Sequence, residues 1–212
     1  MSKIRILVAD DHRILAEGLR RLLEPTYEVV AIAENGHVMV AAAKELKPDV
    51  IVVDISMPLL NGIDAVSEIR SAGIQAKIIY LTMHLEANYA RRALATGASA
   101  YVLKHSVSSE LLFAIEEALA GRCFVTPTIA ANLERTRTPE DVSLDALDSL
   151  TVRQREVLQL VAEGYSAKEV SNFLKLSRRT VEYHKYSIMN ALGLHKSAEL
   201  IQFAVQKGLV SQ

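Results

Sequence analysis

Cysteine and long hydrophobic runs are the scarcest features of this 212-residue sequence. Its single cysteine, Cys123, cannot form an intramolecular disulfide, and a metal site built on several thiolates is excluded. No hydrophobic run reaches the roughly 18 residues of a membrane span, and Asp10 and Asp11 interrupt the N-terminal run before it reaches signal-peptide length. We therefore expect a cytoplasmic protein in a reducing compartment, with no membrane contact.

The sequence also lacks a large net charge, because 24 basic residues nearly balance 25 acidic ones. This balance hides an uneven distribution. Residues 1–122 carry 13 basic and 15 acidic side chains, residues 123–150 carry 2 and 5, and residues 151–212 carry 9 and 5. The last segment therefore has a net charge of +4, which favours binding to a polyanion.

Short runs rich in valine and isoleucine recur through the first half of the chain. Each is too short for a helix and suits a buried parallel strand. Helix-length segments separate the runs, with leucines at helical spacing such as Leu15, Leu19 and Leu22. This alternation predicts an α/β domain with a five-stranded, parallel, doubly wound sheet of the flavodoxin type. The expected strands span residues 4–9, 28–33, 50–53, 77–81 and 100–103.

A charged, turn-forming stretch follows this domain and has no sustained apolar stripe, which is typical of a linker. Every later segment has a helical pattern. The sequence thus predicts an α/β domain over 1–122, a linker over 123–149 and a helical domain over 150–212.

Capping patterns mark where the later helices begin. Thr151 with Gln154 and Ser166 with Glu169 have the spacing of capping boxes, and Ser177 suits an N-cap position. Four short helices, with a tight connection between the second and third, predict a small all-α helix-turn-helix domain.

Polar residues follow four of the predicted strands: Asp10 and Asp11, Asp54, Thr82, and Lys104. The carboxyl ends of strands in such a sheet converge on one crevice, so we expect these side chains to meet there. Three close carboxylates repel one another and need a cation, and carboxylate with water ligation suits Mg²⁺. A cation there favours a phosphoryl group, whose other oxygens Lys104 and Thr82 would hold.

These residues closely resemble the receiver domains of two-component response regulators, and the match covers most of the α/β domain. The residues that carry it are Asp10, Asp11, the run Asp54-Ile55-Ser56-Met57-Pro58, Gly62, Thr82, Tyr101 and Lys104. By this resemblance Asp54 is the nucleophile that accepts a phosphoryl group from a sensor histidine kinase. Asp11, Asp54 and the backbone carbonyl of Ser56 would hold Mg²⁺, and Asp10 would act through a metal-bound water.

The resemblance also implies a switch. Lys104 would pair with the phosphoryl oxygens, while the Thr82 hydroxyl moves to the phosphate and the Tyr101 ring moves into the vacated space. Taken alone, Tyr101 is more often a packed strand residue than a switch. His84 could tune the access of hydrolytic water, but it is interpreted as a plain loop histidine. Many receivers have proline after the lysine, whereas His105 follows Lys104 here.

Three segments of the helical domain, at residues 150–158, 163–170 and 176–184, match a known motif in spacing and residue type. Through them the domain resembles the LuxR/FixJ-type helix-turn-helix, the output module of the NarL/FixJ class. A helix beginning at Arg178 would present Glu182, Tyr183 and Tyr186 to DNA bases, with Val181, Ile188 and Leu192 turned inward. For Glu182 the alternative is a surface ion pair with Arg178 or Arg179. The expected contacts to the DNA backbone are Lys168, Arg178, Arg179, Thr180, Lys185 and Lys196.

These resemblances imply a DNA-binding transcription regulator controlled by phosphorylation of Asp54, with no enzyme activity beyond its own Mg²⁺-dependent phosphorylation and dephosphorylation. The implied partners are double-stranded DNA and a sensor histidine kinase, with RNA polymerase as a further candidate and a homodimer as the active form. One alternative is an aspartyl-nucleophile phosphatase, but such enzymes commonly carry a second acid at the position of Ser56. The other is a helical protein-interaction module, which leaves the +4 charge unexplained.

Overall fold

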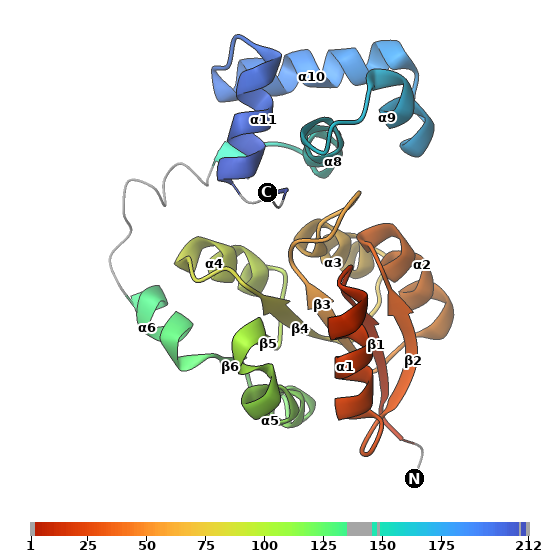
Figure 1. The fold of residues 1–212 in the computed structure, drawn as a ribbon, viewed down its shortest axis with the longest axis vertical. Helices are drawn as coiled ribbons and strands as arrows, with labels where there is room; N and C mark the ends of the chain where they lie inside the picture. Colours follow the sequence, from red (N-terminus) through yellow and green to blue (C-terminus); the bar gives the residue numbers. More distant parts are fainter. Residues whose placement is uncertain (1–2, 135–145, 148, 208, 211–212) are drawn as a thin grey trace. The chain divides into compact units, whose positions relative to one another are not determined.

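The computed structural model describes residues 3–134, 146–147, 149–207 and 209–210. The chain divides into two compact units, residues 1–136 and residues 137–212 (Figure 1). The first unit is an α/β domain and the second is helical, as the sequence predicts. No helix in the described ranges is both long and apolar enough to cross a membrane.

A six-stranded parallel sheet forms the centre of the first unit. Its strands are β1 (Arg5–Ala9), β2 (Glu28–Ala33), β3 (Val50–Asp54), β4 (Lys77–Thr82), β5 (Ala100–Leu103) and β6 (Phe124–Val125). Their order is β2-β1-β3-β4-β5-β6, which confirms the doubly wound arrangement and adds a sixth strand to the predicted five. Because β1 pairs with both β2 and β3, the order reverses there, and a crevice opens at the carboxyl ends of β1 and β3.

Helices cover both faces of this sheet. The described residues of the unit form α1 (Arg13–Leu23), α2 (Gly36–Leu46), α3 (Gly62–Ser71), α4 (Ala87–Ala95), the 3₁₀ turn η1 (Lys104–Ser106), α5 (Val107–Leu119) and α6 (Pro127–Glu134). One buried cluster joins α1 and α5 to one face of the sheet, and another joins α2, α3, α4 and α6 to the opposite face.

The strand β1 shows why its sequence is continuously apolar. Ile6 and Val8 lie in the cluster with α1 and α5, whereas Leu7 and Ala9 lie in the cluster on the other face. All four are buried, so both faces of the strand require apolar residues and the usual alternation of apolar and polar residues is missing.

The segment 123–134, which the sequence analysis assigned to the linker, is part of the first compact unit. β6 pairs with β5, aligning Phe124 with Ala100, and Ile129 of α6 is buried in the core beside α4. The unit therefore extends to residue 136 instead of ending at 122. A two-residue strand and an eight-residue helix are too short to give a periodic apolar pattern, and core packing defines them. Positions 135–145 and 148 of the expected linker lie outside the described residues.

Four helices of at least seven residues form the core of the second unit within its described residues. They are α8 (Val152–Ala162), α9 (Ala167–Phe173), α10 (Arg178–Leu192) and α11 (Ser197–Gln206). α8 contacts the other three, and α9 contacts α10. This arrangement confirms the predicted four-helix domain.

The predicted capping patterns form in the structure. Thr151 Oγ1 accepts the N–H of Gln154 at 3.2 Å, and the Gln154 side chain accepts the N–H of Thr151 at 2.8 Å. Ser166 and Glu169 make the equivalent capping box before α9. Ser177 Oγ accepts the N–H of Thr180 at 3.1 Å and so fixes the beginning of α10.

Candidate functional site

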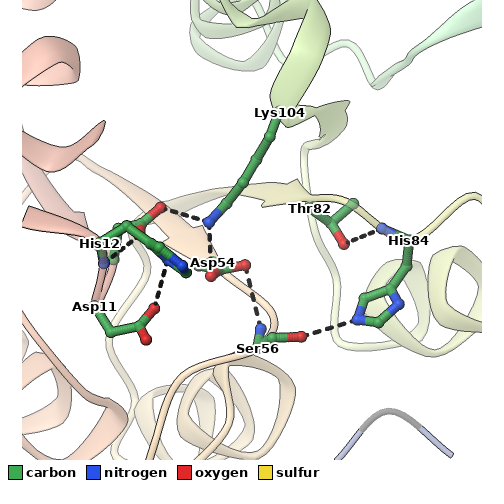
Figure 2. A network of polar contacts seen from close by, with 8 residues as sticks. Asp11, His12, Asp54, Ser56, Thr82, His84 and Lys104 are labelled. Atoms are coloured by element: carbon green, nitrogen blue, oxygen red, sulfur yellow. Dashed lines mark hydrogen bonds and ion pairs between the residues drawn. The ribbon is translucent and has the colours of Figure 1, made fainter. Parts of the chain in front are cut away.

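A polar pocket lies at the carboxyl ends of the central strands. Asp10 follows β1, Asp54 ends β3, Thr82 ends β4 and Lys104 follows β5. Parallel pairing brings these four strand ends to one edge of the sheet, where Figure 2 shows the labelled side chains facing a common space. Asp10, Asp54 and Thr82 are buried, as their position in the crevice requires.

Lys104 bridges the two buried carboxylates. Its Nζ lies 2.8 Å from Asp10 Oδ2 and 2.8 Å from Asp54 Oδ2. Burial raises the pKa of Asp54, and the Lys104 ammonium opposes part of this rise. Burial also acts to lower the pKa of Lys104, but its contacts with Asp54 and Asp10 outweigh burial and raise it. Lys104 is therefore charged at neutral pH and holds the Asp54 carboxylate in one orientation.

The acidic groups of the pocket lie close enough to share a cation. Ligand atoms of Asp10, Asp11, His12 and Asp54 all lie within 4.8 Å of one another. Three carboxylates against one Lys104 ammonium leave two negative charges, which matches the charge of a divalent metal ion. The donor set therefore fits a metal site.

His12 also belongs to this pocket, and it is not among the residues predicted from the sequence. Its Nδ1 lies 3.0 Å from Asp11 Oδ1 and 3.2 Å from Asp10 Oδ1, and its backbone N–H donates to Asp10 Oδ1 at 2.9 Å. The signal in the sequence was its position directly after the two aspartates.

The loop between β3 and α3 closes around Asp54. The N–H of Ser56 donates to Asp54 Oδ1 at 3.2 Å, and the N–H of Gly62 donates to the carbonyl of Ile55 at 2.9 Å. A Cβ atom on Gly62 would lie 2.1 Å from the Asp54 carbonyl oxygen, so only glycine permits this approach of backbone to backbone.

Thr82 and Tyr101, the two predicted switch residues, both contact His84. The Thr82 hydroxyl accepts the N–H of His84 at 2.9 Å, and the Tyr101 hydroxyl donates to the carbonyl of His84 at 3.3 Å. Both side chains are fully buried, so Tyr101 has its ring turned inward in this structure.

The interpretation of His84 as a plain loop histidine is wrong. Its Nε2 lies 2.8 Å from Ser56 Oγ, and its ring stacks on Tyr89 with centroids 4.1 Å apart. Burial lowers the pKa of the imidazole, which favours the neutral form. The contact with Ser56 joins segments 28 residues apart, so no local pattern in the sequence marks it.

The residue after Lys104 does not disturb the pocket. Every peptide bond in the described ranges is trans, and Lys104, His105 and Ser106 form the 3₁₀ turn η1. Lys104 thus reaches Asp54 from a turn that contains no proline.

In the second unit, α10 presents the predicted base-facing residues. Glu182, Tyr183 and Tyr186 are exposed, with Tyr183 67% and Tyr186 65% accessible. Both rings are therefore accessible to a binding partner. On the inward side of the helix, Val181 and Ile188 are buried and Leu192 is half-buried.

The residues predicted to contact the DNA backbone lie on α10 or on segments beside it. Glu182 forms an ion pair with Lys185, at 3.2 Å, whereas the alternative to its base contact named Arg178 or Arg179 as the partner. The Thr180 hydroxyl contacts Ser177 Oγ at 2.8 Å and so supports the helix start. Thr180 and Lys185 are half-buried, and the exposed members of the set are Lys168, Arg178, Arg179 and Lys196.

Comparison with known proteins matches both units to families. Residues 6–116 match the response regulator receiver domain, and residues 148–204 match the bacterial regulatory proteins of the luxR family. The fold and pocket thus define a two-component response regulator.

Full-length relatives share this organisation. The chain is 34% identical to the oxygen regulatory protein NreC of Staphylococcus aureus, across 98% of this chain and 99% of NreC. It is 31% identical to the transcriptional regulatory protein DegU of Brevibacillus brevis, across 99% of this chain and 96% of DegU. A solved RcsB–DNA complex is similar with a TM-score of 0.59 and 26% identity, across 95% of this chain and 98% of RcsB. The chain therefore belongs to the NarL/FixJ class of response regulators, and it is a DNA-binding transcription regulator and not an enzyme.

Proposed function

We propose that Asp54 accepts a phosphoryl group from a sensor histidine kinase and that the phosphorylated state controls binding to double-stranded DNA. The observation that carries this proposal is the position of Asp54, which is buried at the end of β3 with its carboxylate 2.8 Å from the Lys104 ammonium. An ammonium at this distance orients the nucleophile and can then neutralise a transferred phosphoryl oxygen.

Mg²⁺ is the cation that this donor set favours, because hard oxygen ligands and water suit it. Asp11, Asp54 and the backbone carbonyl of Ser56 would hold the ion, with Asp10 acting through a bound water. When bound, Mg²⁺ neutralises charge on the carboxylates and on the phosphoryl oxygens.

The chain's own residues carry out the transfer. An Asp54 carboxylate oxygen forms a bond to phosphorus while the bond from phosphorus to the kinase histidine nitrogen breaks, and the electron pair of that bond stays on the imidazole. Lys104 pairs with a phosphoryl oxygen. The Thr82 hydroxyl turns to donate to another, and Tyr101 stays turned inward behind it.

Residues 150–212 contact DNA in this proposal, and residues 1–122 with their β6–α6 extension form the phosphoacceptor domain. Glu182, Tyr183 and Tyr186 face the bases in this proposal, and all three side chains are exposed on α10. The other predicted DNA-binding residues contact the phosphates of the DNA backbone: Lys168, Arg178, Arg179, Thr180, Lys185 and Lys196. The similarity to RcsB, which was solved in complex with DNA, supports this assignment. The proposal also includes a cytoplasmic location, an active homodimer and RNA polymerase as a partner.

Intact-mass measurement tests the phosphoacceptor. The full chain is incubated with a small phosphodonor, with and without Mg²⁺, and a single phosphoryl adduct is expected only with the metal. Asp54→Asn should abolish the adduct. The matched control is Asp49→Asn, which changes an exposed carboxylate at the opposite end of the same strand. Labelling of Asp54→Asn at the wild-type rate would refute the assignment.

A further inference from the structure

The helix α6 docks on the part of the first unit that contains the switch residues. Ile129 of α6 is fully buried in the same cluster as Tyr89, Ala90 and Tyr101. Figure 1 shows α6 as the last labelled helix of this unit.

Two hydrogen bonds fasten α6 beyond this apolar contact. The Asn132 side-chain amide donates to the carbonyl of Leu85, at 3.1 Å, in the loop between β4 and α4. Arg91 of α4 donates to the carbonyl of Leu133 at 3.4 Å. The first bond is the informative one, because Leu85 directly follows His84.

His84 connects this loop to both switch residues. Its N–H donates to Thr82 Oγ1 at 2.9 Å, and its carbonyl accepts from Tyr101 Oη at 3.3 Å. Figure 2 shows the Thr82 hydroxyl held by the His84 backbone on the side of the pocket away from Lys104. A hydrogen bond to a phosphoryl group on Asp54 would draw this hydroxyl away and leave the His84 N–H without its acceptor.

The segment just before α6 is hydrogen-bonded to β5, the strand that contains Tyr101. The N–H of Thr126 donates to the carbonyl of Tyr101 at 3.0 Å, and Thr126 Oγ1 accepts the N–H of Leu103 at 3.2 Å. The segment from β6 through α6 is thus fixed at its start by β5 and near its end by the β4–α4 loop. At the end of α6, the bond from Asn132 is the one that reaches the β4–α4 loop, whereas the bond from Arg91 comes from α4.

We infer that α6 senses phosphorylation of Asp54 through the bond between Asn132 and the Leu85 carbonyl, and that phosphorylation loosens α6 from α4. This inference depends on the proposed phosphoacceptor role of Asp54. Three events would follow phosphorylation in order. The Thr82 hydroxyl turns toward the phosphoryl group, the backbone at residues 84–85 shifts, and the bond between Asn132 and the Leu85 carbonyl is lost. Because α6 has only eight residues, it is not stable as a helix once it leaves the core, so its amides then exchange with solvent.

Hydrogen exchange of the full-length protein tests this coupling, with the phosphoryl adduct quantified by intact mass in the same samples. In the wild type, phosphorylation should accelerate exchange of the peptide covering α6 by about fivefold, the equivalent of one net hydrogen bond. Asn132→Ala should show this acceleration without phosphorylation and gain little more from it. The matched control is Thr128→Ala, an exposed position on the same helix, which should behave as the wild type.

The two proposals fail in different ways. A fully phosphorylated wild type with unchanged exchange in α6 overturns the coupling and leaves Asp54 as the phosphoacceptor. An unphosphorylated Asn132→Ala variant with wild-type exchange in α6 also overturns it. Absence of the adduct overturns the phosphoacceptor assignment and, with it, the inference that depends on it.

Discussion

Replacing Gly62 with alanine should both destabilise the first unit and slow phosphorylation of Asp54. The added Cβ would lie 2.1 Å from the Asp54 carbonyl oxygen and 3.0 Å from a methyl carbon of Val53. To reach an ordinary contact, the start of α3 and the end of β3 must separate by about 1 Å, and both are packed in the core. Overpacking of this kind lowers the free energy of unfolding by up to about 3 kcal/mol.

Amides that exchange only on unfolding should then exchange about a hundredfold faster, since each 1.4 kcal/mol changes the unfolding equilibrium constant tenfold. Native-state hydrogen exchange of the β3 peptide measures the first unit without interference from the second. Displacement of Asp54 should also slow formation of the phosphoryl adduct in the intact-mass assay.

Gly18→Ala is the matched control, because a Cβ at this exposed position in α1 meets nothing within 4 Å. Alanine is the better helix former, so this change should stabilise the first unit by about 0.5–1 kcal/mol. If Gly62→Ala exchanges and is phosphorylated like the wild type, the close backbone approach does not constrain the pocket.

Four further substitutions probe separate parts of the molecule. Lys104→Gln removes the ammonium that competes with a bound cation for the carboxylates. Calorimetric titration should therefore show Mg²⁺ binding at least about tenfold tighter, and phosphorylation of Asp54 should be slower. An unchanged Mg²⁺ affinity would contradict this prediction. In DNA titrations at several salt concentrations, Lys185→Ala should weaken all duplexes equally and flatten the salt slope by about one unit. Tyr183→Ala should instead cost about 1–3 kcal/mol at the specific site alone, and the reverse pattern would refute the assignment of the α10 face. Ser166→Ala should destabilise the second unit by about 1 kcal/mol through loss of the N-cap, and unchanged exchange in α9 would contradict this.

Most of the secondary structure could be predicted from the sequence because its causes are local. The five long strands are continuous apolar runs, and the cap residues Thr151, Ser166 and Ser177 bond to amides only three residues away. β6 and α6 could not be predicted, since they are short and are defined by pairing with β5 and by burial of Ile129.

The chemistry of the pocket was determined by the sequence in its residue types and by the tertiary structure in its contacts. Polar residues at strand ends must gather at one edge of a parallel sheet, so Asp10, Asp54 and Lys104 could be placed together from the strand pattern alone. The bridging of both carboxylates by Lys104 and the contact of His84 with Ser56 depend on loop paths and packing between segments far apart in the chain. Such contacts have no period or spacing in the sequence, and only the folded backbone decides them.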